Sequence, residues 1–180
     1  MQKKETIPFW LAVVITALVP LPLSLFLGKW NVPLWVSFVV WAQYFVYGAS
    51  PEAFGKIFGP YAVGALFSTA GMVLTALLGQ LFGSYVGLNL GFGIAVAVMV
   101  YVMRYVPLFQ EASLAYFNGM AMMLAVYFTG SFPSLNAGPV LVPVIAGLWA
   151  ILCGWFGAFL GWFNVTITFP REVEATAEAA

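Results

Sequence analysis

The sequence predicts an all-α integral membrane protein with six transmembrane helices, and three observations carry this prediction. Of the 180 residues, 63% are hydrophobic and only 7% are charged, and the mean hydropathy is +1.01. Globular domains carry about a quarter charged residues. Six long apolar segments follow one another, and a short motif recurs in the second half of the chain. The lipid bilayer is therefore the expected partner of most of the surface.

The first apolar segment runs from about Pro8 to Leu27, after the polar start Met-Gln-Lys-Lys-Glu. It continues for about 20 residues, the length of a transmembrane helix, and lacks a small-residue cleavage site at the right distance. We therefore expect a retained first span and not a secretory signal. Pro20 and Pro22 remove backbone donors and should kink or break its second half.

The other five segments are expected over residues 33–48, 60–82, 86–103, 109–130 and 140–163. Residues 33–48, the first of these five, are short for a bilayer core of about 30 Å. The Glu- and Ala-rich stretch 171–180 is expected to be a disordered cytoplasmic tail.

The cations predict the orientation, because cytoplasmic loops are enriched in Lys and Arg. Lys29 alone falls in the loop between the first two segments. The other five fall at the termini and in the loops that share their side: Lys3, Lys4, Lys56, Arg104 and Arg171. Both termini are therefore expected in the cytoplasm.

The recurring motif predicts two related halves. Lys-Trp-Asn-Val-Pro-Leu-Trp begins at Lys29, and Arg-Tyr-Val-Pro-Leu-Phe begins at Arg104. Tyr44-Phe45 precedes Gly48, as Tyr127-Phe128 precedes Gly130. Because each half would hold three spans, residues 1–83 and 84–170 would form two inverted three-helix repeats. The alternative is that such short echoes arise by chance in a biased composition.

The chain contains few of the residue types that carry out catalysis or bind metal ions. There is no His and no Asp, all six acidic residues are Glu, and Cys153 is the single cysteine. No metal-ligand set, no Ser-His or Cys-His pair and no pair of neighbouring carboxylates within a span is present in the sequence. We expect no enzyme, no cofactor and no metal, and, with six basic residues balanced by six acidic ones, no nucleic acid partner.

Uncharged polar side chains within and beside the spans are the candidates for a solute path. An unpartnered amide in hydrocarbon costs a few kcal/mol, so Gln43 and Asn118 should face protein or a water-filled cavity. The alternative role is hydrogen bonding between helices. The candidates are Gln43, Tyr44, Tyr47, Ser50, Glu52, Asn118, Tyr127, Ser131 and Asn136. A path with such a lining would be neutral, without the charged groups of proton relays and ion sites.

The loops 49–59 and 131–139 allow two interpretations. Ser50-Pro51-Glu52 is a helix-start signature, with Ser as the capping residue. Alternatively, a short helix from Ser50 dips into the membrane and is broken by Gly55, Gly59 and Pro60, and the 131–139 loop supplies its repeat partner.

Glycines four residues apart predict close helix contacts, either within one subunit or in a homo-oligomer. They are Gly83, Gly87 and Gly91 in one row and Gly157 and Gly161 in another.

The chain resembles a family of small bacterial inner-membrane proteins catalogued as domain of unknown function family 1097. The resemblance rests on residues 35–48 with their Trp-Ala-x-Tyr-Phe core, on Lys56, on Val106-Pro107, and on Tyr127-Phe128-Thr129-Gly130. It implies a bundle of six spans and no catalytic residues.

Three functions remain open at this point. The first is an oligomeric channel or facilitator for a small neutral or weakly polar solute, in which Gln43, Tyr44, Asn118 and Tyr127 share a hydrated cavity. The second is an accessory or structural membrane subunit with a dry, fully paired bundle. The third is a secondary transporter.

Overall fold

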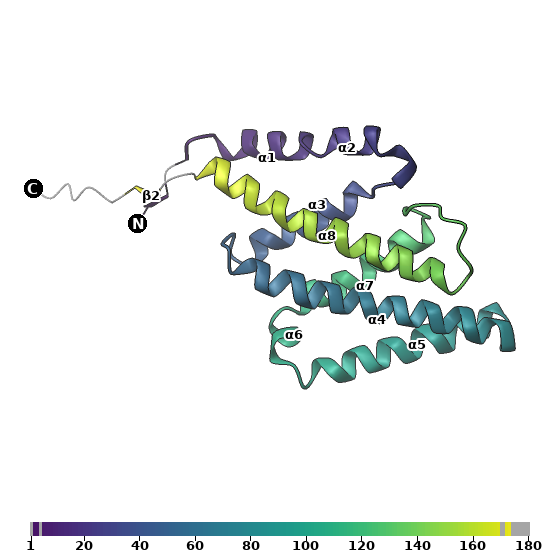
Figure 1. The fold of residues 1–180 in the computed structure, drawn as a ribbon. Helices are drawn as coiled ribbons and strands as arrows, with labels where there is room; N and C mark the ends of the chain where they lie inside the picture. Colours follow the sequence, from purple (N-terminus) through teal and green to yellow (C-terminus); the bar gives the residue numbers. More distant parts are fainter. Residues whose placement is uncertain (1, 4, 170–171, 174–180) are drawn as a thin grey trace, which may run out of the picture.

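The computed structural model describes residues 2–3, 5–169 and 172–173, which are almost entirely helical (Figure 1). Most of the predicted tail lies outside the described residues. In chain order the elements are β1 (Gln2–Lys3), α1 (Phe9–Leu18), α2 (Leu21–Phe26), the 3₁₀ helix η1 (Gly28–Trp30), α3 (Leu34–Val46), α4 (Ala53–Phe82), α5 (Ser84–Met103), α6 (Pro107–Glu111), α7 (Ser113–Phe128), α8 (Leu141–Thr168) and β2 (Glu172–Val173). The two short strands pair antiparallel near the termini.

Four segments of the described chain are long and apolar enough to cross a membrane: Phe9–Phe26, which joins α1 and α2, together with α4, α5 and α8. The apolar helices α3 and α7 are shorter, with 13 and 16 residues. With 30 residues, α4 is about 45 Å long and exceeds the hydrocarbon thickness of about 30 Å. These helices define a multi-pass membrane protein.

Helices α4 and α8 cross antiparallel at the centre of the bundle. The Tyr61 hydroxyl donates to the Ala150 carbonyl at 3.3 Å, and Trp155 Nε1 donates to the Phe58 carbonyl at 3.2 Å. Thr69, further along α4, lies against Gly147, which is earlier on α8. Side chains of α4 thus pack against small residues of α8 at this crossing, because Gly147 and Gly154 leave room for Thr69 and Tyr61.

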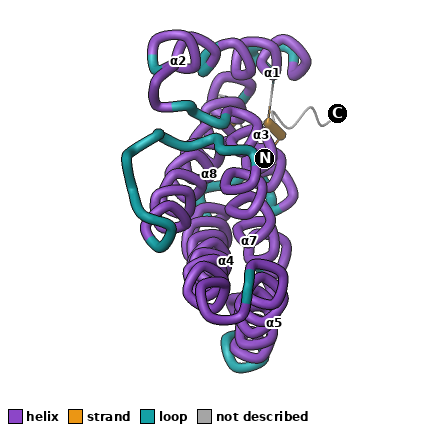
Figure 2. The backbone as a smooth tube through the Cα atoms, turned by 90° about the vertical axis from the view of Figure 1, so that its right-hand side faces the viewer, coloured by secondary structure: helices purple, strands orange, loops and turns teal. Residues whose placement is uncertain are grey.

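Each central helix has a parallel neighbour. Ser37 of α3 donates to the Cys153 carbonyl of α8 at 2.7 Å, and Tyr44 lies against Gly161 further along both helices. In the same way, α7 runs parallel to α4, and the Ser68 hydroxyl donates to the Met120 carbonyl at 3.2 Å. Figure 2 shows α3, α4, α7 and α8 stacked in the middle, with α1 and α2 at one edge and α5 at the other.

Helices α4 and α5 form a tight antiparallel hairpin. The turn between them is Gly83, which has a positive φ of 85° that glycine adopts without strain. A β carbon on Gly87 would collide with Gly79, and one on Gly91 would collide with Thr75. Gly157 and Gly161 likewise meet Ser37 and Tyr44. Four of the five predicted close contacts are thus made within one subunit, whereas no atom lies within 4 Å of a β carbon built on Gly83, so the contact predicted there is wrong. The predicted homo-oligomer stays a prediction with no surface assigned by these glycines.

Pro20 interrupts a helix and Pro60 does not. The first span breaks between α1 and α2 at Val19 and Pro20, as expected. Pro60, in contrast, lies inside a continuous α4 that begins at Ala53, so the expected break there is wrong. The buried positions Ala53, Ile57 and Tyr61 form one uninterrupted helical stripe, whose packing holds the helix together across the missing proline N–H.

The hypothesis of paired half-helices is therefore not supported by the structure. Residues 53–59 belong to α4, and residues 129–140 contain no helix. The Ser50 side chain does not cap α4; its carbonyl accepts from the Ala53 N–H at 3.0 Å. A hydrogen bond from Ser50 lowers the pKa of the Glu52 carboxyl, which is exposed in the turn before α4.

Candidate functional site

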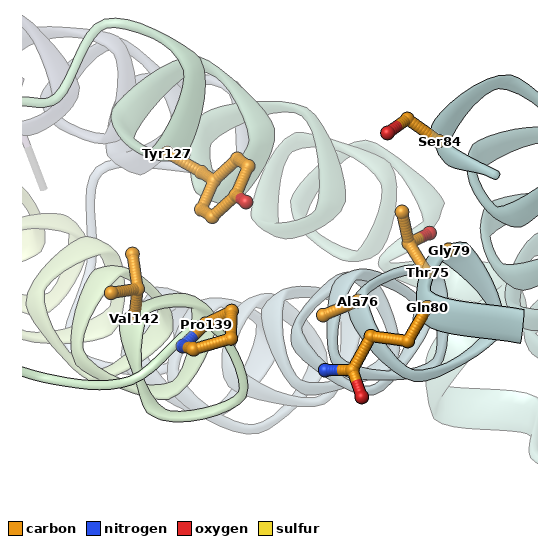
Figure 3. A pocket seen from close by; sticks show the side chains of 8 residues that line it. All are labelled: Thr75, Ala76, Gly79, Gln80, Ser84, Tyr127, Pro139 and Val142. Carbon is orange, nitrogen blue, oxygen red and sulfur yellow. The ribbon is translucent and has the colours of Figure 1, made fainter.

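A cavity of about 420 Å³ lies beside the turn between α4 and α5, which Figure 1 shows at the end of the bundle opposite the β1–β2 pair; Figure 3 shows its lining. The ends of α4 and α7 and the starts of α5 and α8 surround it, so residues from both halves of the chain contribute. The lining residues are Thr75, Ala76, Gly79, Gln80, Ser84, Tyr127, Pro139 and Val142. Ala76, Gly79 and Val142 are small, which leaves the space between α4 and α8 unfilled at this end.

Thr75 is the most informative residue of the lining. Its hydroxyl oxygen is buried and has no hydrogen-bond partner. Other helical threonines, such as Thr69, donate to the carbonyl four residues earlier, at 2.9 Å for Ala65. A buried hydroxyl without a partner pays a desolvation cost of about 1–3 kcal/mol. The Thr75 hydroxyl lies against Gly91 of α5 and has almost no accessible surface, so it belongs to the α4–α5 contact and is not presented to the cavity.

The remaining polar groups of the lining are also uncharged. Gln80 carries an amide, and the hydroxyls of Ser84 and Tyr127 face the space between the helices in Figure 3. Hydroxyls and amides both donate and accept hydrogen bonds. The lining contains no carboxylate, amine or guanidinium. Such a surface suits an uncharged polar molecule better than an ion.

The cavity belongs to one end of the bundle and does not reach its other end. Toward the middle of the bundle, Thr69 packs against Gly147 and the Ser68 hydroxyl bonds to the Met120 carbonyl. Beyond them, the fully buried Tyr61 ring lies against Gly154. These contacts connect α4 to both α7 and α8, so the inner end of the cavity is packed.

Two predicted path residues lie in the packed part of the bundle. Gln43 is only 2% exposed, and neither polar atom of its amide has a hydrogen-bond partner. Tyr44 is 1% exposed, and its ring lies 5.4 Å from that of Phe54 and against Gly161. Neither residue lines the cavity that contains Tyr127, so the structure does not bring these candidates together.

The other predicted residues lie elsewhere. The Tyr47 hydroxyl accepts from the Ala115 N–H at 3.0 Å and so satisfies a donor in the first turn of α7. Asn118 is half-buried on α7, outside the cavity lining. Ser131 shares a hydrogen bond of 2.8 Å with Thr129, and Asn136 is exposed in the connection to α8. Ser50 and Glu52 form the turn before α4.

The sequence analysis missed three lining residues: Thr75, Gln80 and Ser84. One signal was present for Thr75, which takes the middle position of a row spaced by four, between Gly71 and Gly79. Glycines in such a row let the α5 backbone approach, and a hydroxyl among them is confined to the helix contact. Gln80 and Ser84 flank the Gly83 turn and carry no comparable signal.

The described residues contain no group of three or more His, Cys, Asp or Glu side chains that could hold a metal ion. The free Cys153 is buried on α8. The polar chemistry of the cavity therefore rests on hydroxyl and amide groups.

The fold and the cavity define a helical multi-pass membrane protein with an uncharged polar cavity at one end. Residues 11–162 match the family described as "Protein of unknown function (DUF1097)". The match covers most of the chain, and the protein belongs to this family, as its resemblance suggested. No curated protein and no solved structure matches the chain.

Proposed function

We propose that the protein is a facilitator that moves a small, uncharged or weakly polar solute across a bacterial inner membrane. In this proposal both termini face the cytoplasm, the chain crosses the membrane six times, and the two halves are inverted three-helix repeats. The cavity at Thr75 and Tyr127 would be the solute entrance on the side away from the termini.

The inverted arrangement has support in the pairing of helices. Helix α3 of the first half runs parallel to α8 of the second, and α7 of the second half runs parallel to α4 of the first. If the two halves are exchanged, α3 takes the place of α7 and α8 takes the place of α4. The α3–α8 contact then becomes the α7–α4 contact, so both parallel contacts are kept. A pseudo-two-fold axis in the membrane plane has this effect, and transporters place their solute site where such repeats meet.

The ends of α3 and α7 support the same relation. Both helices end in a glycine with positive φ, 99° at Gly48 and 64° at Gly130. In each case the following N–H reaches back to the carbonyl five residues earlier, from Ala49 to Tyr44 and from Ser131 to Val126, both at 3.0 Å. These are equivalent Schellman turns at equivalent places in the two halves.

The uncharged polar lining carries the proposal of a polar solute, because the hydroxyls of Ser84 and Tyr127 face the cavity and Gln80 adds an amide. A cavity that is open at one end and packed at its inner end favours a carrier over a permanently open channel. An accessory subunit, the second candidate, would not need such a cavity.

Stopped-flow light scattering on proteoliposomes tests this proposal. Vesicles with the protein are expected to equilibrate urea or glycerol faster than empty vesicles. Replacing Tyr127 by Phe removes a hydroxyl that faces the cavity and should slow this flux. Tyr85→Phe is the matched control, because Tyr85 is 81% exposed and lies outside the cavity lining. Equal rates with and without protein for every solute would favour the accessory subunit.

A further inference from the structure

The two ends of the α4–α8 pair differ in how they are filled. Where the cavity lies, the facing residues are Ala76 and Val142. At the end nearer the termini, four aromatic rings fill the same contact, and we call them the aromatic zipper. The zipper consists of Phe54 and Phe58 of α4 and Trp155 and Phe159 of α8, with ring centroids 5.4 Å apart for Phe54–Phe159, 5.4 Å for Phe58–Trp155 and 5.6 Å for Phe58–Phe159.

Helix α3 adds to the zipper. The Tyr44 ring lies 5.4 Å from that of Phe54, and its β carbon lies against Gly161 of α8. Tyr44 thus joins the zipper to the end of α3. Under the proposed inversion, the end of α3 is the counterpart of the end of α7, where Tyr127 lines the open cavity.

The residue before Tyr44 is the buried amide of Gln43. It is 2% exposed, and both its nitrogen and its oxygen lack hydrogen-bond partners. A glutamine amide carries two N–H donors and a carbonyl oxygen that accepts. Burying this amide without any hydrogen bond costs free energy. The alternative role of Gln43, hydrogen bonding between helices, would supply at least one partner, and the amide has none in this structure.

We propose that Gln43 belongs to a second solute-binding surface, closed in this structure by the aromatic zipper and opened to the side of the termini in an alternate state. The ligand class is the same as for the cavity, a small uncharged molecule that both donates and accepts hydrogen bonds. This inference rests on the proposed function, because the inverted repeats make the two ends equivalent and rocking between them would alternate the open end.

Cysteine accessibility tests the inference without measuring transport. Replacing the single Cys153 by Ala gives a background in which Gln43→Cys is the only thiol. An open state populated at about 1% would label Gln43→Cys about 100-fold more slowly than the exposed Glu52→Cys, with a membrane-impermeant maleimide added on the side of the termini. Val40→Cys, fully buried one turn earlier on α3, is the matched control and should stay unlabelled.

Opening the zipper should raise the labelling rate of Gln43→Cys from that side by about tenfold or more, as the open population rises toward 10%. Phe58→Ala removes the ring that contacts both Trp155 and Phe159, and Phe58→Leu is the milder variant should the first fail to fold. Three results would overturn the proposal that the zipper closes a surface at Gln43: labelling of Gln43→Cys no faster than Val40→Cys, labelling only from the cavity side, or no response to either Phe58 variant. Solute flux without this labelling would refute this proposal alone. The expected labelling without flux would refute only the transport proposal.

Discussion

Gly119 of α7 faces the backbone carbonyl of Tyr61 across the crossing with α4, and a β carbon at this glycine would overlap the carbonyl. The relation is reciprocal, because Gly64 of α4 faces the carbonyl of Tyr116 on α7 in the same way. This pair of contacts brings the two parallel backbones together without intervening side chains. The α4–α7 contact therefore depends on two glycines and tolerates no larger residue.

Gly119→Ala is expected to destabilise the protein. The obstacle is a backbone carbonyl, which cannot move aside as a side-chain end could, so the helices must separate. Overpacking of this kind costs about 1–3 kcal/mol or more. Thermal unfolding of the purified protein in detergent, followed by tryptophan fluorescence, measures the loss as a lower Tm.

Gly93→Ala serves as the control for this measurement. Gly93 is exposed on α5, and no atom would contact its added β carbon. Alanine is favoured over glycine in a helix by about 1 kcal/mol, so the Tm should stay or rise slightly. Equal losses in both variants would mean that helix propensity or the detergent, and not the α4–α7 contact, governs stability.

Tyr47→Phe is expected to lower stability by about 1–3 kcal/mol. The phenylalanine keeps the ring but removes the hydroxyl that accepts from the Ala115 N–H, which leaves a donor unsatisfied in the first turn of α7. The same detergent unfolding assay detects this loss. Tyr85→Phe, on a residue that is 81% exposed, should leave the Tm unchanged. A Tm of Tyr47→Phe equal to that of the parent would show that water replaces the tyrosine and that α7 needs no such cap.

Ser37→Ala should have a smaller effect of about 0.6 kcal/mol, the average for hydrogen bonds between membrane helices. The lost bond runs from the Ser37 hydroxyl to the Cys153 carbonyl, which already takes part in helix α8. Ser24→Ala is the comparison, because the Ser24 hydroxyl bonds within its own helix to Leu21. A larger loss at Ser24 than at Ser37 would contradict the assigned α3–α8 contact.

The sequence predicted the helical segments well where one local signal was sufficient. Apolar length located the main helices, and Pro20 ended α1 as expected. The signal of Pro60 was overridden, because the buried stripe from Ala53 to Tyr61 is a property of the packed bundle and not of the proline's immediate neighbours. A proline in the sequence therefore predicts a helix boundary only where tertiary packing does not oppose it.

The cavity was harder to predict because its lining combines four helices. Tyr127, Gln43 and Tyr44 were all candidates because each is a polar residue in an apolar segment. In the structure, Tyr127 lines the cavity, and Gln43 and Tyr44 are packed in the core. Polarity shows which residues need a partner, but not whether the partner is another helix, water or a solute. Thr75 could be singled out only when its hydroxyl was seen to lack the usual carbonyl partner.

Solute flux should be independent of pH between about pH 6 and about pH 8, because the cavity lining contains no His, Cys, Asp, Glu, Lys or Arg side chain. The lowered pKa of Glu52 keeps that carboxyl ionised there as well, and any stability it adds would be lost only as the pH falls through the lowered value. Flux measured at both pH values without a gradient tests this expectation. A strong pH dependence, or flux driven by a proton gradient, would instead indicate a coupled transporter.

The most direct test of the proposed function is reversible block of flux through a thiol placed in the cavity. In the Cys153→Ala background, Ser84→Cys puts a single thiol in the lining, and Ser134→Cys puts one on an exposed residue outside it. A methanethiosulfonate reagent should slow urea or glycerol flux in Ser84→Cys, a reducing agent should restore it, and Ser134→Cys should be unaffected. Full modification of Ser84→Cys with unchanged flux would contradict the cavity as the solute path.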